Sequence, residues 1–78
     1  LNLKIYPNPS KNEIHIKTKR SQISDLLVYN LDGKLIKNIR NIFSPSYTLD
    51  ISNFEAGLYL IEVELNDGTR SKERFIKP

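Results

Sequence analysis

The sequence predicts an all-β fold, an antiparallel sandwich of about seven strands. Apolar and polar residues alternate along short runs, and clusters of Gly, Pro, Asn and Asp recur at intervals of about eight to twelve residues. No window of about eleven residues holds a persuasive helical period. With 78 residues, the chain should form a single domain spanning 1–78. It has no initiator methionine and no leader, so we expect it to be a piece of a longer protein.

The first strand is expected at residues 1–6, because Leu1 and every second residue after it are apolar and place one face on a core. Pro7 and Pro9 then remove two backbone donors, so the chain should leave the sheet there as a turn. Alternation resumes at residues 14–17, where two isoleucines face inward and the residues between and after them face outward.

The third and fourth strands, at residues 23–30 and 35–39, flank Asp32 and Gly33, a pair that readily supplies the positive φ of a tight hairpin. A polar break around Pro45 precedes a short fifth strand at residues 47–51. These spacings are typical of antiparallel strands joined by short turns.

The sixth strand, at residues 58–65, is expected to be central. One of its faces is wholly apolar and the other begins with two leucines, so it should start buried on both sides and finish half exposed. An Asn-Asp-Gly turn then leads to the last strand at residues 70–77, which Phe75 and Ile76 should hold by an apolar grip.

The segment "FEAGLY" predicts a tyrosine corner between the fifth and sixth strands. In Greek-key sandwiches such a tyrosine, here Tyr59, bonds through its hydroxyl to upstream backbone. Gly57 would adopt a geometry that a Cβ disfavours, and Phe54 would close the end of the core. A structural role is favoured over ligand contact, because a buried tyrosine hydroxyl needs such a partner.

No catalytic residue, metal site or cofactor is expected. The chain has no cysteine, and His15 is its only histidine, without Asp or Glu at metal-ligand spacing. Glu62 and Glu64 share one strand face but lack the enclosure that separates the pKa values of an acid/base pair. Three glycines cannot build a phosphate-binding loop, and the longest apolar runs are far too short to span a membrane.

The charge is segregated along the chain. Residues 41–69 hold five carboxylates and no Lys or Arg, so all twelve basic residues lie outside them. An anionic partner and a simple solvated surface both remain open as explanations. Lys17, Lys19 and Arg20 with Tyr6 or Tyr29 do not form the aromatic-basic motifs of single-strand binders, so nucleic acid is not an expected partner.

Four segments in one order, "IYPNPS", "VYNLDGKLI", "LDISNFEAGLYLIEV" and "RSKERFIKP", resemble the C-terminal type A sorting domain of the type IX (Por) secretion system of Bacteroidetes. The resemblance covers nearly the whole chain. It is carried by a Pro-x-Pro opening, a Gly-x-Tyr motif and a lysine-bearing tail, at Pro7, Asn8, Pro9, Gly57, Leu58, Tyr59, Lys72 and Lys77.

The resemblance implies an immunoglobulin-like sandwich that catalyses nothing and acts as a removable export signal. Its cargo, covalently linked upstream, would pass through the periplasm to the cell surface or the medium. The implied partners are an outer-membrane translocon and a sortase-like peptidase that removes the domain. The domain itself is expected to be a monomer that is not inserted in the membrane.

By the family pattern, the last strand and its tail form the recognition region, which corresponds here to Lys72, Arg74, Phe75, Ile76 and Lys77. Pro78 departs from the basic or polar terminus of many relatives. The alternative is an immunoglobulin-like accessory module for adhesion or carbohydrate binding, since a fold does not fix a function. The absence of tryptophan disfavours a glycan platform.

Overall fold

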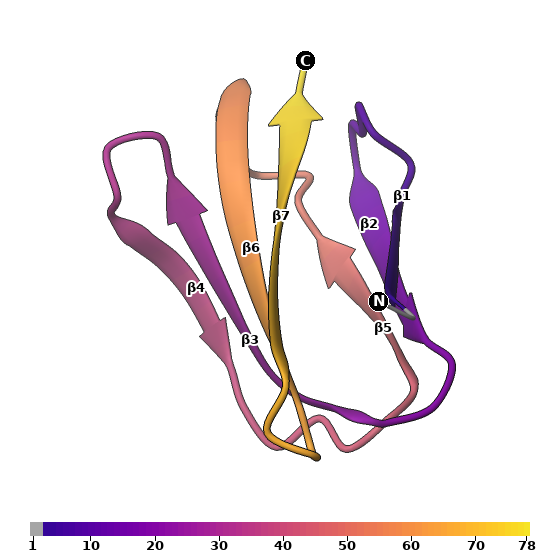
Figure 1. The fold of residues 1–78 in the computed structure, drawn as a ribbon. Helices are drawn as coiled ribbons and strands as arrows, with labels where there is room; N and C mark the ends of the chain where they lie inside the picture. The colour runs from indigo at the N-terminus through magenta and orange to yellow at the C-terminus, as the bar shows by residue number, and fades with distance from the viewer. Residues whose placement is uncertain (1–2) are drawn as a thin grey trace.

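The computed structural model describes residues 3–78 as two antiparallel sheets that face each other (Figure 1). One sheet has the strand order β1-β2-β5 and the other has the order β4-β3-β6-β7. The predicted sandwich and its central sixth strand are thereby confirmed. Within these residues no helix has the length and apolar content that a membrane crossing requires. The strands are β1 Leu3–Tyr6, β2 Glu13–Thr18, β3 Ile23–Asn30, β4 Leu35–Ile39, β5 Ser46–Asp50, β6 Gly57–Leu65 and β7 Arg70–Lys77.

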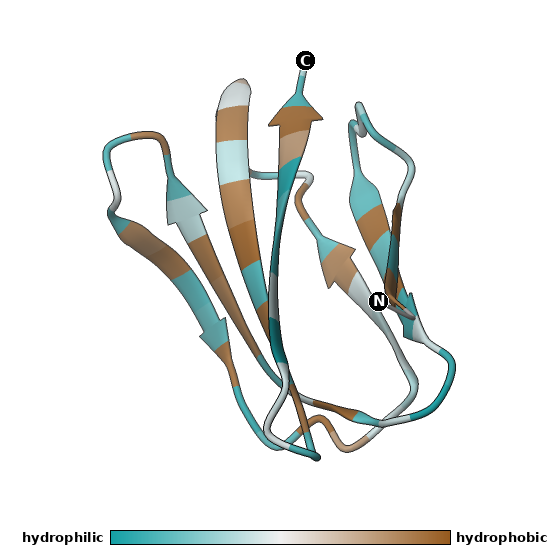
Figure 2. Cartoon of the chain, viewed as in Figure 1, coloured by the Kyte–Doolittle hydropathy of each residue, from teal (hydrophilic) through white to brown (hydrophobic). Residues whose placement is uncertain are grey.

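The core lies between the sheets and follows from the period of two. Along the strands, apolar and polar bands alternate, and the apolar ones meet inside (Figure 2). Leu1, expected in the first strand, lies outside the described residues. The buried apolar side chains are Ile14, Ile16, Ile23, Leu26, Val28, Leu49, Ile51, Tyr59, Ile61, Val63, Leu65 and Phe75.

The tyrosine corner is confirmed. The Tyr59 hydroxyl donates a hydrogen bond of 2.6 Å to the carbonyl oxygen of Glu55. Gly57 has a φ of +153°, which a residue with a Cβ rarely adopts. The rings of Phe54 and Tyr59 lie 5.0 Å apart, and that of Tyr59 lies 5.2 Å from Phe75. The corner therefore closes one end of the core with three aromatic side chains.

Two aspartates organise turns by accepting hydrogen bonds from the residue two positions further along the chain. The Oδ1 atom of Asp50 accepts from the hydroxyl and the N–H of Ser52 at 2.7 and 2.9 Å. Asp67 accepts from the N–H of Thr69 at 2.9 Å. These bonds favour the charged form, so they lower the pKa of both carboxyls below the usual 3.8.

The burial of two strands, β6 and β7, differs from the prediction. The reason is that residues 3–78 leave the outer face of the four-stranded sheet uncovered. Strand alternation turns Phe75 into the core and therefore turns Ile76 out, where 49% of its surface is exposed. Of the two apolar residues expected to anchor β7, only Phe75 is therefore buried in the core. Leu58 and Leu60 point to the same outer face and are half-buried, so β6 does not start buried on both sides.

Candidate recognition surface on the last strand

Strand β7 forms one edge of the four-stranded sheet and pairs only with β6. Its side chains alternate between the two faces: Phe75 lies in the core, whereas Lys72, Arg74 and Ile76 are exposed. The structure therefore brings three of the five predicted recognition residues into one row on the outer face. Phe75 and Lys77 lie apart from that row.

The Lys77 ammonium ties the end of β7 to two loops. It donates hydrogen bonds to the carbonyl oxygens of Lys11, of Ile51 at 2.9 Å and of Ser52 at 3.3 Å. An ammonium has three donors, so these carbonyls can occupy all of them. Lys77 therefore holds the strand end in place rather than presenting a free charge.

The Pro-x-Pro turn lies against the outer backbone edge of β7. The Asn8 side-chain amide donates to the Arg74 carbonyl at 3.2 Å and accepts from the Ile76 N–H at 3.0 Å. The N–H of Ser10 donates to the Ile76 carbonyl at 3.0 Å. Asn8 thus takes the place of a neighbouring peptide group, and the peptide bonds before Pro7 and Pro9 are both cis.

The turn covers only the C-terminal half of this edge. Backbone groups of alternate residues point to the same side of an antiparallel strand, so those of Lys72 point outward with those of Arg74 and Ile76. Within residues 3–78, the outward N–H groups of Lys72 and Arg74 donate no hydrogen bond, and the outward C=O of Lys72 accepts none. A short segment of unpaired edge therefore remains from Arg70 to Arg74.

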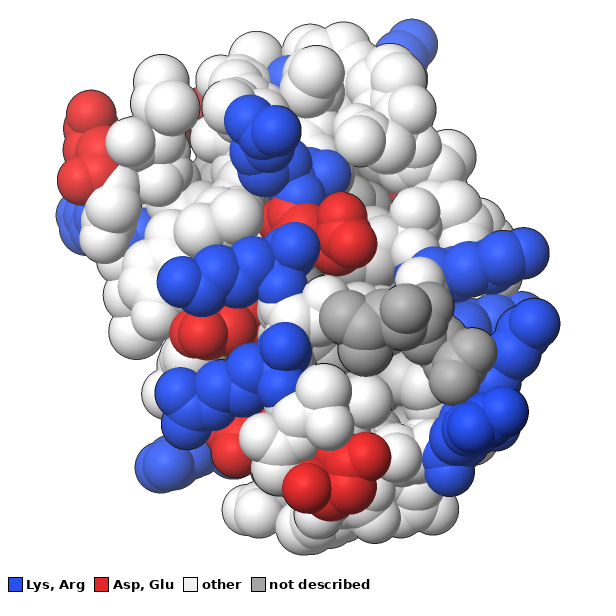
Figure 3. Space-filling model, viewed as in Figure 1, with Lys and Arg blue, Asp and Glu red and all other residues white. Residues whose placement is uncertain are grey.

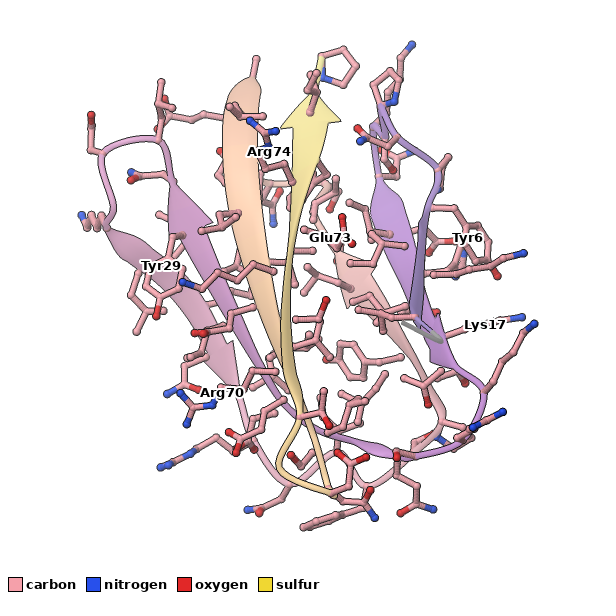
Figure 4. All side chains as sticks on the ribbon, in the orientation of Figure 1. Tyr6, Lys17, Tyr29, Arg70, Glu73 and Arg74 are labelled. Atoms are coloured by element: carbon pink, nitrogen blue, oxygen red, sulfur yellow. The ribbon has the colours of Figure 1, made fainter. Side chains whose placement is uncertain are left out.

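Arg74 lies beside exposed apolar side chains on the outer face, in the upper half of the view in Figure 4. Leu60 is its direct cross-strand neighbour, and Leu58 faces Ile76 in the same way. Leu31, in the turn that follows β3, is 76% exposed, and with Leu58, Leu60 and Arg74 it lines a depression of about 240 Å³. We name these residues the Arg74 patch: Leu31, Leu58, Leu60, Arg74 and Ile76.

Sequence reasoning missed the three leucines of the Arg74 patch. Leu58 and Leu60 are apolar residues on the second face of β6, a pattern that predicts a strand buried on both sides rather than an exposed apolar surface. The strand register supplies the missing information, because it places Leu58 and Leu60 on β6 beside the Arg74 side chain of β7. Among residues 3–78, Arg74 has no carboxylate within 4.0 Å.

The other half of the outer face is charged and internally balanced. Glu64 and Arg70 form an ion pair of 3.8 Å, and Glu62 is the cross-strand neighbour of Lys72. Acidic and basic side chains alternate over this part of the surface in Figure 3. Exposed pairs of this kind contribute at most about 1 kcal/mol to stability. As predicted, Glu62 and Glu64 lie together on the solvent-facing side.

His15 lies on the outer face of the other sheet. Its Nδ1 atom is 3.1 Å from the Thr48 hydroxyl, and its Nε2 atom is 3.5 Å from a carboxylate oxygen of Glu13. Within the described part of the chain, no group of three or more His, Cys, Asp or Glu side chains is placed to hold a metal ion. The predicted outward position of His15 is confirmed.

Comparison with known proteins gives the following matches. The model of the family described as "Secretion system C-terminal sorting domain" matches residues 4–77. The ulvan lyase NLR42 of Nonlabens ulvanivorans is 26% identical over 72 residues, which are 92% of this chain and 14% of that protein. The chain thus spans a small part of that curated relative.

A crystal structure from Bacteroides vulgatus with an immunoglobulin-like β-sandwich fold superimposes with a TM-score of 0.79 at 16% identity. The superposition covers 99% of this chain and 85% of that protein. At this identity the likeness concerns the fold, and it confirms the immunoglobulin-like architecture.

Proposed function

The chain belongs to the family of secretion system C-terminal sorting domains, and we propose that the exposed row of strand β7 is what the export machinery recognises. The domain is a sorting signal of the type IX secretion system, which directs its cargo across the outer membrane. Of the two functions that the sequence left open, the family match supports sorting over an accessory binding module.

The observation that carries the proposal is the composition of the Arg74 patch. Arginine is enriched among the residues that dominate protein–protein binding energy, and the Arg74 guanidinium can donate several hydrogen bonds while a partner covers the apolar surface beside it. Lys72 extends the row by one position toward the charged half of the face. Phe75 and Lys77 would contribute indirectly by fixing the position of the strand.

Backbone pairing with a partner would be confined to the N-terminal half of β7, at Arg70, Lys72 and Arg74. An exposed strand edge can accept an added strand, but the Asn8 turn already occupies the edge at Ile76. A partner would therefore recognise β7 mainly through side chains, with backbone bonds available only in its N-terminal half. The rigidity of the sandwich limits the ordering entropy that docking costs.

The partners that follow from this role are an outer-membrane translocon, a sortase-like peptidase and a cargo linked upstream. The domain would travel with the cargo through the periplasm and be removed after export, without catalysing a reaction itself. One relative of the chain is an enzyme, which is consistent with a sorting domain serving a larger exported protein.

Charge reversal at Arg74 tests the proposal. Residues 1–78 are fused behind a signal peptide and a fluorescent cargo in a Bacteroidetes host, and surface fluorescence is measured. We expect Arg74→Glu to abolish most of the surface signal while Arg20→Glu, an equal charge change in an exposed turn, leaves it intact. Wild-type surface fluorescence for Arg74→Glu would refute the proposed role of the Arg74 patch.

Point substitution is preferable to truncation here. Deleting the last six residues would remove Phe75 from the core, together with the Lys77 bonds, so loss of export could simply reflect unfolding. The Arg74 side chain is exposed and can be changed without opening a cavity. Circular dichroism of the purified variants confirms that the fold is retained.

A further inference from the structure

Two lysines face each other on the outer side of the three-stranded sheet. Lys4 of β1 and Lys17 of β2 are direct cross-strand neighbours, and both are exposed. Within residues 3–78 neither ammonium has a carboxylate partner within 4.0 Å. Like charges placed opposite each other destabilise a sheet, so this pair calls for an explanation other than stability.

Protection of a sheet edge accounts for only one member of the pair. Lysine on an edge strand discourages pairing with another chain, and β1 is an edge strand. Lys17, however, lies on β2, the central strand of this sheet, where no edge needs protection. The second lysine therefore points to an anion that binds between the two ammonium groups.

Tyr6 completes the same site. It follows Lys4 on the outer face of β1, is 38% exposed, and lies with its ring centroid 5.9 Å from the Lys17 Nζ. That distance is near the limit of about 6 Å for a cation–π contact, so the ring holds the ammonium only weakly. Lys4, Ile5, Tyr6 and Lys17 line an open depression of about 500 Å³. Figure 4 shows Tyr6 and Lys17 projecting from the same side of the sandwich.

The acidic groups of this face lie at its opposite end. Glu13 and Asp50 are cross-strand neighbours there; Glu13 contacts His15, and Asp50 accepts hydrogen bonds from Ser52. Lys and Arg side chains gather on the side of the molecule formed by β1 and β2 in Figure 3. An approaching anion therefore meets positive charge at the Lys4 end of the sheet.

We propose that Lys4, Tyr6 and Lys17 form a binding site for an acidic polysaccharide. The two ammonium groups would bind a carboxylate or sulfate group, and the Tyr6 ring would pack against the face of the adjoining sugar. The depression is open to solvent, so a polymer chain could lie across it. Single-stranded nucleic acid fits less well, because it needs successive aromatic platforms and the His15 ring is already packed 5.3 Å from Tyr6.

Affinity electrophoresis of the 78-residue chain through gels containing polygalacturonate, heparin or neutral dextran tests the site. We expect retardation by at least one of the two anionic polymers and none by dextran. The double variant K4Q/K17Q should weaken binding about fivefold, as expected for two exposed charge contacts. The matched double variant K34Q/K37Q, in the hairpin of β3 and β4, removes the same charge and should bind like the wild type.

Tyr6→Ser and Tyr29→Ser separate a sugar site from general charge attraction. Tyr6→Ser should weaken binding to the retained polymer, whereas Tyr29→Ser, on the other sheet, should not. The proposal would be overturned if K4Q/K17Q and K34Q/K37Q weakened polymer binding equally, or if neither anionic polymer retarded the wild-type chain. Binding of a deoxythymidine oligonucleotide that is lost in K4Q/K17Q, without polysaccharide binding, would overturn the assignment of the ligand. Each of these outcomes is independent of export, so it leaves the proposed role of β7 unaffected.

Discussion

Replacing Asn8 with alanine should detach the Pro-x-Pro turn from β7. The substitution removes two hydrogen bonds, the one donated to the Arg74 carbonyl at 3.2 Å and the one accepted from the Ile76 N–H at 3.0 Å. Each such bond contributes a net ~0.5–1.5 kcal/mol. Because both groups lie at an exposed edge where water can replace Asn8, we expect the free energy of unfolding to fall by about 1–2 kcal/mol.

Thermal unfolding followed by circular dichroism measures this loss. In a domain of this size, a decrease of 1 kcal/mol lowers Tm by about 4–8 °C, so Asn8→Ala should melt about 4–16 °C below the wild type. Hydrogen exchange provides the local measurement: the Ile76 amide should lose protection, while the amides of β6 that pair with β3 should keep theirs.

Asn12→Ala is the matched control, because Asn12 lies in the same turn and uses its backbone carbonyl to accept from the Ile51 N–H. That bond survives the substitution, so the control should melt close to the wild type. If Asn12→Ala were as destabilising as Asn8→Ala, or if the Ile76 amide in Asn8→Ala exchanged as slowly as before, the assigned role of the Asn8 side chain would be wrong.

Three further outcomes can be measured by unfolding of purified variants. Tyr59→Phe keeps the ring but loses the bond to the Glu55 carbonyl, which should cost ~1–2 kcal/mol in urea titration. Lys77→Met loses a charged group bonded to three carbonyls and should cost ~1–3 kcal/mol, whereas a methionine at an unbonded exposed lysine should change stability by less than about 0.5 kcal/mol. Hydrogen bonding lowers the pKa of Asp50 and Asp67, so the contribution of these carboxylates to the free energy of unfolding is present above pH 3.8 and is lost as the pH falls through the lowered pKa values. Replacing both with asparagine should therefore make the free energy of unfolding less dependent on pH in that acidic range.

The sequence alone predicted the strands well, because their signals are local. A period of two identifies a strand wherever one face is buried, and Asp-Gly pairs mark the turns. The third and fourth strands coincide with β3 and β4 at both ends. The tyrosine corner was equally accessible, since Tyr59 and its partner Glu55 are four residues apart.

The contacts that shape the candidate recognition surface could not be predicted in this way, because they join distant parts of the chain. Asn8 lies 66 and 68 residues before the two residues that it bonds on β7. Nothing near Asn8 in the sequence distinguishes it from an ordinary turn asparagine. Periodicity likewise showed that Leu58 and Leu60 share a face but could not show that this face lacks a covering layer.

The direction of the strands bears on how the domain could present both a cargo and a signal. Strands β1 and β7 run the same way in Figure 1, and the chain enters β1 on the side of the three-stranded sheet, away from the top end at which it leaves β7. An upstream cargo would then emerge from the three-stranded sheet, away from the C-terminal half of β7. Because Arg74 and Ile76 lie in that half, a bulky cargo would leave the Arg74 patch accessible. Moving the cargo to the C-terminus of residues 1–78 should therefore impair export even when the fold and every residue of the patch are unchanged.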